Sequence, residues 1–332
     1  MTDFNLQEIQ LVERLRDNYE TLNKAKVTFV DKRIRYLIAR LFMKEEAELD
    51  IEKFMAMSQY LKEETGVFTT LTTNIRASLA GLLVASGEES PIAAQRLVSF
   101  YKQLIDAKFQ RTEYTYFAAY LLLENKEGTR AVISKAREIY LELKADHPFL
   151  TGAEDITSSV MLAQMGTDMT VHEIAEITEY YYQAFADLKL RKSNGLQFLA
   201  ATGTLLYGEK QKAYIEQVKK VLAILDKERI KITELHYSGV GIMAFALGEQ
   251  KLDGKFLAKL IEELKRLPVL RFDRKFQTAI AISLYIENEI GHMDQQQVEG
   301  LMISMNLLIA IEQAALASVA AASTVAASSG GN

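Results

Sequence analysis

One short pattern returns along the chain at nearly constant distance, and it limits the possible folds more than any other feature of the sequence. A small and apolar segment ends in a short polar turn, and an amphipathic, charged segment follows. Residues 77–88, ASLAGLLVASGE, are the clearest copy. Successive turns are 39 to 42 residues apart, and such a constant period is typical of stacked structural repeats. The turns centre on Glu46, Gly87, Lys126, Gly166, Gly208, Gly248 and Asn288.

Both segments of the pattern have the helical period, with apolar residues at i, i+3, i+4 and i+7. Only three prolines in 332 residues interrupt this period, and strand-like alternating runs are missing from the sequence. We call the first segment of each unit the A helix and the second the B helix. The A helices are apolar on almost every face and need neighbours on several sides, whereas the B helices have one charged side. The sequence therefore predicts an all-α, two-layer helical-repeat array of about seven 40-residue units, either an α-solenoid or an α/α toroid.

The period also sets the expected helix boundaries. The A helices are expected at 31–43, 72–86, 112–123, 153–163, 194–207, 234–247 and 273–286, and the B helices at 51–64, 91–107, 129–145, 171–188, 211–227 and 254–266. Residues 1–30 and 295–316 are expected to cap the two ends, which makes 1–316 a single domain. The Ala/Ser-rich residues 317–332 are expected to be disordered. Glu312 interrupts the apolar C-terminal stretch, which argues against integral membrane insertion.

Two columns of residues become visible when the A helices are aligned on their turns. The residue seven positions before the turn is always small: Ala39, Ala80, Ala119, Ser159, Ala201, Gly241 and Ala281. Small residues at one phase allow neighbouring A helices to approach closely. The residue eleven positions before the turn can always form hydrogen bonds: Arg35, Arg76, Thr115, Asp155, Gln197, Tyr237 and Gln277.

This polar column has two interpretations. The first turn of a helix is often polar because it lies near water and near unpaired backbone N–H groups. Alternatively, the column lines a concave face or a central cavity and binds a ligand there, with Arg35 and Arg76 as anion-binding donors. His147, eight residues before Asp155, is added to this candidate binding site; it either shapes the turn before Pro148 or acts as an acid or base.

Composition and motifs exclude several other functions. Lys and Arg number 39 against 44 Asp and Glu, so the basic excess of a general nucleic-acid binder is missing and no nucleic-acid partner is expected. Without cysteine, a disulfide or a thiolate zinc site is impossible, and the four histidines have no metal-binding spacing. No phosphate-binding glycine motif follows a strand. We expect no cofactor and no catalytic residue, and the N-terminus has no secretory signal, so a cytoplasmic location is expected.

The stretch His147–Asp155, with Ser158–Ala163, resembles an uncharacterised bacterial family, domain of unknown function 4003. Phe29–Arg33, Leu37–Ala39 and the Ala/Ser-rich tail after Glu312 support the resemblance, which extends over nearly the whole chain. It implies a helical protein of low-GC Gram-positive bacteria. It brings no activity, ligand or catalytic residue.

The function expected from these features is that of a non-enzymatic scaffold. Its concave A-helix face would bind a peptide, a protein or a small ligand. The alternative is an α/α-toroid enzyme, in which Arg76, His147, Asp155 and Tyr237 meet in a central cavity. That alternative rests on analogy between folds alone.

Overall fold

A computed structural model describes residues 4–25, 27, 29–43, 49–65, 70–124, 129–165, 169–248 and 252–290. Every regular element in these ranges is a helix, so the expected all-α fold is confirmed. None of the described helices combines the length and apolar character that a bilayer crossing requires. The cap helix expected at 295–316, the tail at 317–332 and the turns at Glu46, Lys126 and Gly166 lie outside the described residues.

The described chain divides into two compact units. The smaller unit contains Gln10–Gln95, and the larger unit contains Arg96 onward together with the first residues of the N-terminal helix. The division falls within α1 (Phe4–Lys24) and within α5 (Pro91–Asp106). Each unit is described by itself below, and the single domain expected for residues 1–316 stays a prediction.

In the smaller unit, α4 (Thr73–Ala85) packs against both α2 (Lys32–Leu41) and α3 (Ile51–Thr65). The side chains of Asp31 and Thr72 cap α2 and α4, because each accepts a hydrogen bond from a backbone N–H of the first turn. The ring of Tyr19 from α1 stacks on Tyr36 of α2, with 3.9 Å between ring centroids. The A helices α2 and α4 thus form the centre of this unit.

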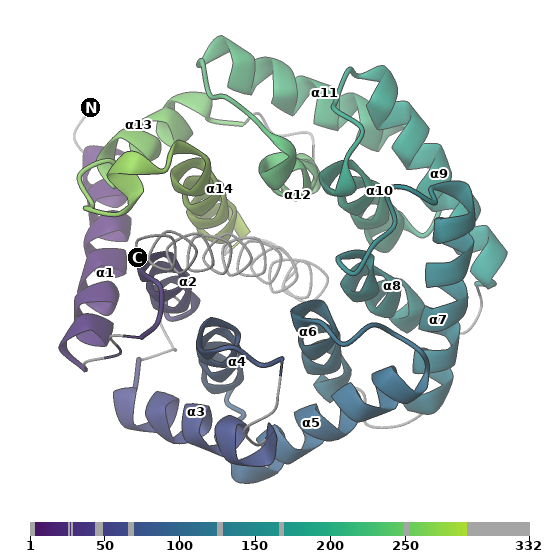
Figure 1. Ribbon diagram of the computed structural model, residues 1–332. Coiled ribbons are helices and arrows are strands. Elements are labelled where there is room, and N and C mark those ends of the chain that lie inside the picture. Colours follow the sequence, from purple (N-terminus) through teal and green to yellow (C-terminus); the bar gives the residue numbers. More distant parts are fainter. Residues whose placement is uncertain are drawn as a thin grey trace, which may run out of the picture. The chain divides into compact units, whose positions relative to one another are not determined.

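In the larger unit, the A helices contact one another in chain order. They are α6 (Glu113–Leu121), α8 (Asp155–Gln164), α10 (Asn194–Tyr207), α12 (Tyr237–Leu247) and α14 (Arg274–Ile290). The B helices α7 (Thr129–Asp146), α9 (Val171–Asp187), α11 (Lys212–Lys227) and α13 (Gly254–Leu264) pack along this row, each against the A helix that follows it in the chain (Figure 1). Three 3₁₀ turns complete the described elements: η1 (Leu122–Glu124), η2 (Glu234–His236) and η3 (Leu270–Phe272).

Burial follows the predicted difference between A and B helices. In α8, every residue from Asp155 to Ala163 is buried, whereas α11 buries Tyr214, Val218, Val221 and Leu225 along one stripe. The small column lies in the interior at all seven positions. At Gly241, an added Cβ would lie 2.5 Å from both Leu199 Cδ1 and Tyr214 Oη. A side chain at this position would therefore push α12 away from its neighbours.

Most helix boundaries agree with the expected spans to within a few residues. The turn glycines Gly87, Gly208 and Gly248 have the positive φ angles expected of them, 78°, 63° and 50°. The turn expected near Asn288 is wrong: α14 continues through Asn288 to Ile290. The A helix expected from residue 153 begins at Asp155, since Gly152 and the two residues after it form a turn that the Asp155 carboxylate closes.

Candidate functional site

The eight residues of the candidate binding site divide between the two units. Arg35 and Arg76 belong to the smaller unit. The other six, Thr115, His147, Asp155, Gln197, Tyr237 and Gln277, belong to the larger unit. The two groups are therefore considered separately.

In the smaller unit, the two arginines differ in their partners. Arg35 Nε donates to the Val30 carbonyl at 3.0 Å, and its Nη1 donates to Asn23 Oδ1. Arg76 makes no hydrogen bond or ion pair with a described residue, although its Nε is fully buried. Burial lowers the pKa of the Arg76 guanidinium. Arg35 holds the α1–α2 connection in place, whereas Arg76 makes no polar contact with a described residue.

In the larger unit, the polar column ties the A helices to the connections between helices. Gln197 Nε2, in the first turn of α10, donates to Thr151 Oγ1 of the α7–α8 connection at 3.1 Å. Tyr237 Oη, in the first turn of α12, accepts a hydrogen bond from the Arg191 backbone N–H at 3.1 Å. Each contact therefore joins one A helix to the connection that precedes the neighbouring A helix.

Thr115 and Gln277 also donate hydrogen bonds, but to carbonyls that lie closer to them in the sequence. Thr115 Oγ1 donates to the Gln110 carbonyl just before α6, and Gln277 Nε2 donates to the Ile261 carbonyl of α13 at 2.9 Å. Both side chains are buried. Each of these carbonyls also accepts a backbone hydrogen bond, from the Thr112 N–H and the Lys265 N–H respectively, so the side chain is a second donor to it.

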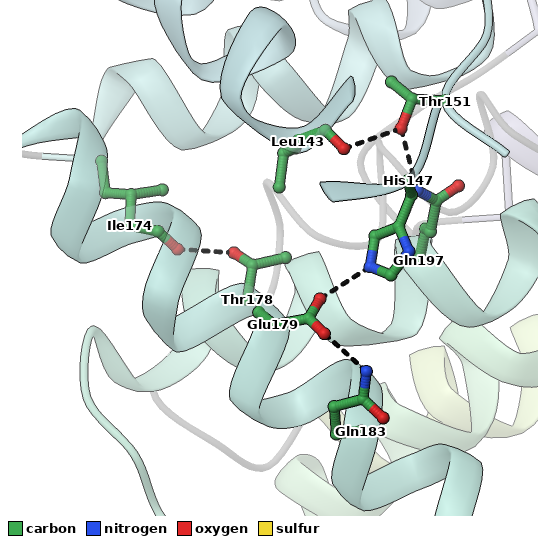
Figure 2. A network of polar contacts seen from close by, with 8 residues as sticks. All are labelled: Leu143, His147, Thr151, Ile174, Thr178, Glu179, Gln183 and Gln197. Carbon is green, nitrogen blue, oxygen red and sulfur yellow. Dashed lines mark hydrogen bonds and ion pairs between the residues drawn. The ribbon is translucent and has the colours of Figure 1, made fainter. Parts of the chain in front are cut away.

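His147 faces α9 and not Asp155. Its Nε2 lies 2.6 Å from Glu179 Oε2, and its ring packs on Tyr182 with 4.3 Å between centroids (Figure 2). Because a carboxylate only accepts hydrogen bonds, Nε2 must carry a proton. Glu179 Oε1 in turn accepts a hydrogen bond from Gln183 Nε2 at 2.6 Å. This pair fixes the start of the α7–α8 connection against α9.

Thr151 makes two of the contacts drawn in Figure 2, with Leu143 and with Gln197. Its hydroxyl donates to the Leu143 carbonyl at 3.1 Å and accepts the amide proton of Gln197. Nearby, Thr178 donates to the Ile174 carbonyl at 2.8 Å, and its hydroxyl lies 3.0 Å from that of Thr204. The hydroxyl of Thr151 thus joins α7 to α10 through a buried position.

Asp155 is a buried carboxyl group. Its side chain is 5% exposed, and burial raises its pKa to about 7. The Gly152 N–H, which donates to Asp155 Oδ2 at 2.9 Å, opposes this rise, and the neighbouring Glu154 adds to it. Near neutral pH, the Asp155 side chain exists in both its neutral and its charged form.

Several buried polar atoms near this connection have no hydrogen-bond partner among the described residues, Thr157 Oγ1 and Tyr182 Oη among them. Two others are Gln197 Oε1, whose amide nitrogen binds Thr151, and Tyr140 Oη, whose pKa is raised by burial and by the nearby Asp155. We call Tyr140, Thr151, Asp155 and Gln197 the polar cluster. It combines a free acceptor, a free donor and a carboxyl group that changes its protonation near neutral pH.

The chemistry open to the polar cluster is hydrogen bonding and proton transfer. No hydrogen bond connects His147 with Asp155, so the acid–base pair suggested by their spacing does not form among the described residues. The described ranges also contain no group of three or more His, Asp or Glu side chains placed to hold a metal ion.

Sequence reasoning missed Glu179, Thr151 and Tyr140. Glu179 lies 32 residues after His147, and no local pattern links the two. Thr151 could have been found, because a Thr between a helix end and a helix start often bonds to the backbone of the preceding helix. Tyr140 carries no such signal, since a tyrosine on the buried stripe of a B helix is an ordinary core residue.

Comparison with known proteins places the chain in an uncharacterised group. Over 313 residues it is 23% identical to the "Uncharacterized protein YeaA" of Bacillus subtilis (strain 168), with 92% of each chain covered. No solved structure matches the chain. The model of one family, described as "Protein of unknown function (DUF4003)", matches residues 18–314. The chain therefore belongs to the DUF4003 family.

Proposed function

We propose that this chain is a non-enzymatic helical-repeat scaffold that binds a peptide, a protein or a small ligand on the face formed by the first turns of its A helices. Support comes from the row of A helices in the larger unit and from the polar column along it. The proposal applies equally to an open superhelix and to a closed toroid.

One observation carries this proposal: the polar cluster contains buried hydrogen-bonding atoms that the fold leaves without partners. A buried polar atom without a partner costs free energy, so a ligand group that pairs with Gln197 Oε1 or Tyr140 Oη would gain stability from the contact. A ligand N–H would pair with Gln197 Oε1, and a ligand carbonyl would pair with the Tyr140 hydroxyl. The peptide group is the commonest chemical unit that offers both.

Asp155 favours an uncharged ligand group at the cluster. Its neutral form adds a further donor, and the buried surroundings that raise its pKa to about 7 also disfavour a charged ligand. A ligand that binds only the neutral form should bind more weakly as the pH rises through this value. We therefore place a polar, uncharged segment of the partner at the polar cluster.

A thermal-shift screen tests this proposal. Libraries of short peptides and of uncharged metabolites are screened against the full chain, because a ligand that binds only the folded state raises the melting temperature. A compound bound at the cluster should lose its shift with Gln197→Met. It should keep its shift with Gln217→Met, a matched change at a half-buried glutamine of α11 that also has an unpaired Oε1. Equal shifts in both variants would contradict binding at the cluster.

A catalytic function is the second candidate. The raised pKa of the Asp155 carboxyl group is the observation that favours it. A carboxyl group with a pKa of about 7 is suited to exchange protons with a substrate at neutral pH. Each compound that shifts the melting temperature is therefore incubated with the protein and analysed by mass spectrometry. Turnover that is lost in Asp155→Asn would support an enzyme, and recovery of every compound unchanged would support the scaffold.

A further inference from the structure

The connections that lead from B helices into A helices lie side by side along one edge of the larger unit. Gln197 joins α10 to the α7–α8 connection, and Tyr237 joins α12 to the α9–α10 connection. His236 Nε2 donates to the Lys275 carbonyl at 2.9 Å, which joins η2 to the first turn of α14. We call this side of the larger unit the basic edge, for the reason given next.

Four of these connections are rich in positive charge. Residues 107–112, 188–193, 228–233 and 265–273 contain ten Lys or Arg side chains and two carboxylates. In the turns that lead from A to B helices, residues 125–128, 165–170, 208–211 and 248–253, the sequence contains three Lys and five carboxylates. The excess of cations is therefore specific to the connections of the basic edge.

Most of these cations make no ion pair with a described residue. Arg191, Lys265 and Arg266 are paired with Glu234, Glu262 and Glu263. Nine others on the connections and in the first turn of α14 are exposed and have no ion pair among the described residues: Lys108, Arg111, Lys189, Lys192, Arg229, Lys231, Arg271, Arg274 and Lys275. Asp187 and Asp226, in the preceding helical turns, lower the net charge without pairing with these cations.

Three of the cations occupy a backbone conformation that disfavours them. Among the described residues, the non-glycine positions with positive φ are Lys108, Lys189 and Arg229, at 71°, 63° and 58°. Each lies two residues after the last residue of a B helix, and its N–H donates to a carbonyl of the last helical turn at 2.9 Å. Glycine is the usual residue at such a left-handed C-terminal position. A cation near a helix C-terminus interacts favourably with the helix dipole, whereas the positive φ angle favours glycine.

The first turn of α14 is also positively charged. Arg274 and Lys275 occupy it, directly after Asp273, whose carboxylate accepts a hydrogen bond from the Phe276 N–H at 3.0 Å. The N-terminus of a helix carries partial positive charge, so carboxylates stabilise it and cations destabilise it. Beyond the Asp273 cap, the first turn of α14 therefore adds two cations to the basic edge.

Two exposed phenyl rings lie on the same edge. Phe272, between Arg271 and the start of α14, is 84% exposed, and Phe149 of the α7–α8 connection is 100% exposed. Contacts of His147 and Thr151 hold the Phe149 connection on both sides of the ring. Phenyl side chains have no polar group for water to bind, and together with free cations they are typical of surfaces that bind at a bilayer interface.

We propose that the basic edge binds the surface of an anionic phospholipid bilayer, with Phe149 and Phe272 entering the interfacial region. The cations bind lipid phosphates, and the rings supply apolar contact. The edge spans five A helices, roughly 30–40 Å at the usual spacing of packed helices. A laterally extended anionic surface fits cations spread over four connections better than a single acidic peptide does. The exposed cations and phenyl rings are different side chains from the buried polar cluster, although both lie where B helices lead into A helices, so vesicle binding and the thermal-shift screen can fail independently.

Co-sedimentation of the full chain with lipid vesicles tests this proposal. The protein should bind vesicles of phosphatidylcholine mixed with phosphatidylglycerol, should not bind phosphatidylcholine alone, and should dissociate as salt is raised. The edge variant Lys192→Gln/Lys231→Gln/Arg274→Gln should weaken binding on the order of a hundredfold, since each cation near an anionic surface contributes about fivefold. Phe272→Ser should weaken binding about tenfold.

A matched control separates the basic edge from net charge. Lys212→Gln/Lys220→Gln/Lys259→Gln removes three exposed cations from α11 and α13 and should leave vesicle binding within about twofold of wild type. Equal losses in the two triple variants would overturn the proposal, as would equal binding to neutral vesicles. Binding to polyuridylate or polyglutamate without binding to anionic vesicles would also overturn it and would identify a nucleic acid or an acidic protein as the partner.

Discussion

The side-chain amide of Gln197 donates to the hydroxyl of Thr151 across 46 residues of sequence, while its own carbonyl oxygen is buried without a partner. The same side chain thus joins two helical units and leaves one polar atom unsatisfied. In this it differs from Gln277, the glutamine at the same place in the last A helix, which has no unsatisfied buried atom among the described residues. The polar column therefore has a structural role throughout and unused hydrogen-bonding capacity at particular positions.

The two glutamines should respond differently to the same substitution. Gln277→Met leaves the buried Ile261 carbonyl without its side-chain donor and should lower the free energy of unfolding by about 1–2 kcal/mol. Gln197→Met loses one hydrogen bond but also removes the buried, unpaired Oε1, so the change should be within about 0.5 kcal/mol of zero. Urea denaturation of both variants measures the difference. Equal losses would show that Gln197 Oε1 carries no cost.

Asp155 should make stability fall as the pH rises from about 4 to about 7. Its pKa in the folded state, about 7, lies above the ordinary value of 3.8, so the folded protein binds more protons than the unfolded chain between these values. A shift of about three units corresponds to a loss on the order of 4 kcal/mol across this range. Asp155→Asn keeps one donor and one acceptor and should remove this dependence, as followed by urea denaturation at a series of pH values.

The control for Asp155 is Asp187→Asn, a change at an exposed carboxyl at the end of α9. This variant should keep the pH dependence of the wild type. If Asp155→Asn and the wild type showed the same dependence, the buried carboxyl would not be the group that titrates.

His236 should act on stability in the opposite direction. Its Nδ1 accepts a hydrogen bond from the Thr233 N–H at 2.9 Å, its Nε2 donates to the Lys275 carbonyl, and burial lowers its pKa. Protonation of Nδ1 would place its N–H opposite the Thr233 N–H, so this hydrogen bond would be lost. Since the unfolded chain binds the proton first, stability should fall as the pH drops below about 6.5.

His236→Leu leaves the Thr233 N–H and the Lys275 carbonyl without their ring partner and should cost about 2–3 kcal/mol near neutral pH. Its stability should also vary less with pH below about 6.5 than that of the wild type. His172→Leu, a change at an exposed histidine of α9, should leave the stability near that of the wild type. A small effect of His236→Leu would mean that the link between η2 and α14 does not stabilise the fold.

Substitution of the two arginines of the smaller unit should also have different effects on the free energy of unfolding. Arg76→Met removes a guanidinium with no hydrogen bond or ion pair among the described residues and should change the free energy of unfolding by less than about 0.5 kcal/mol. Arg35→Met breaks contacts with the Val30 carbonyl and Asn23 and should cost about 1–2 kcal/mol. Thermal unfolding of each single variant measures this contrast. A large loss with Arg76→Met would assign that side chain to folding.

The sequence predicted the helices well because their period and turns are local properties. The A and B spans followed from apolar spacing, and Gly208 and Gly248 marked left-handed turns through their residue type. The continuation of α14 through Asn288 was missed, because an asparagine signals a turn only when the apolar stripe ends with it.

The partners of the polar column could not be predicted in the same way. Alignment on the turns identified Gln197 and Tyr237, but Thr151 and Arg191 lie 46 residues earlier and become neighbours only when the helices pack. The burial of Asp155 likewise depends on helices that surround α8. Nothing in the residue types Lys108, Lys189 and Arg229 indicates a positive φ, because the left-handed position is ordinarily marked by glycine.

The central claim is that this protein keeps residues for binding where other residues would stabilise the fold better. The triple variant Lys108→Gly/Lys189→Gly/Arg229→Gly tests it most directly, with unfolding and binding to anionic vesicles measured on the same preparation. Glycine suits the left-handed backbone at all three positions, and relief of this strain, on the order of 1 kcal/mol, should exceed the lost interaction of each cation with the helix dipole, so each change should raise the free energy of unfolding slightly. Vesicle binding should fall at the same time. A variant that is less stable than the wild type, or more stable with unchanged vesicle binding, would contradict the claim.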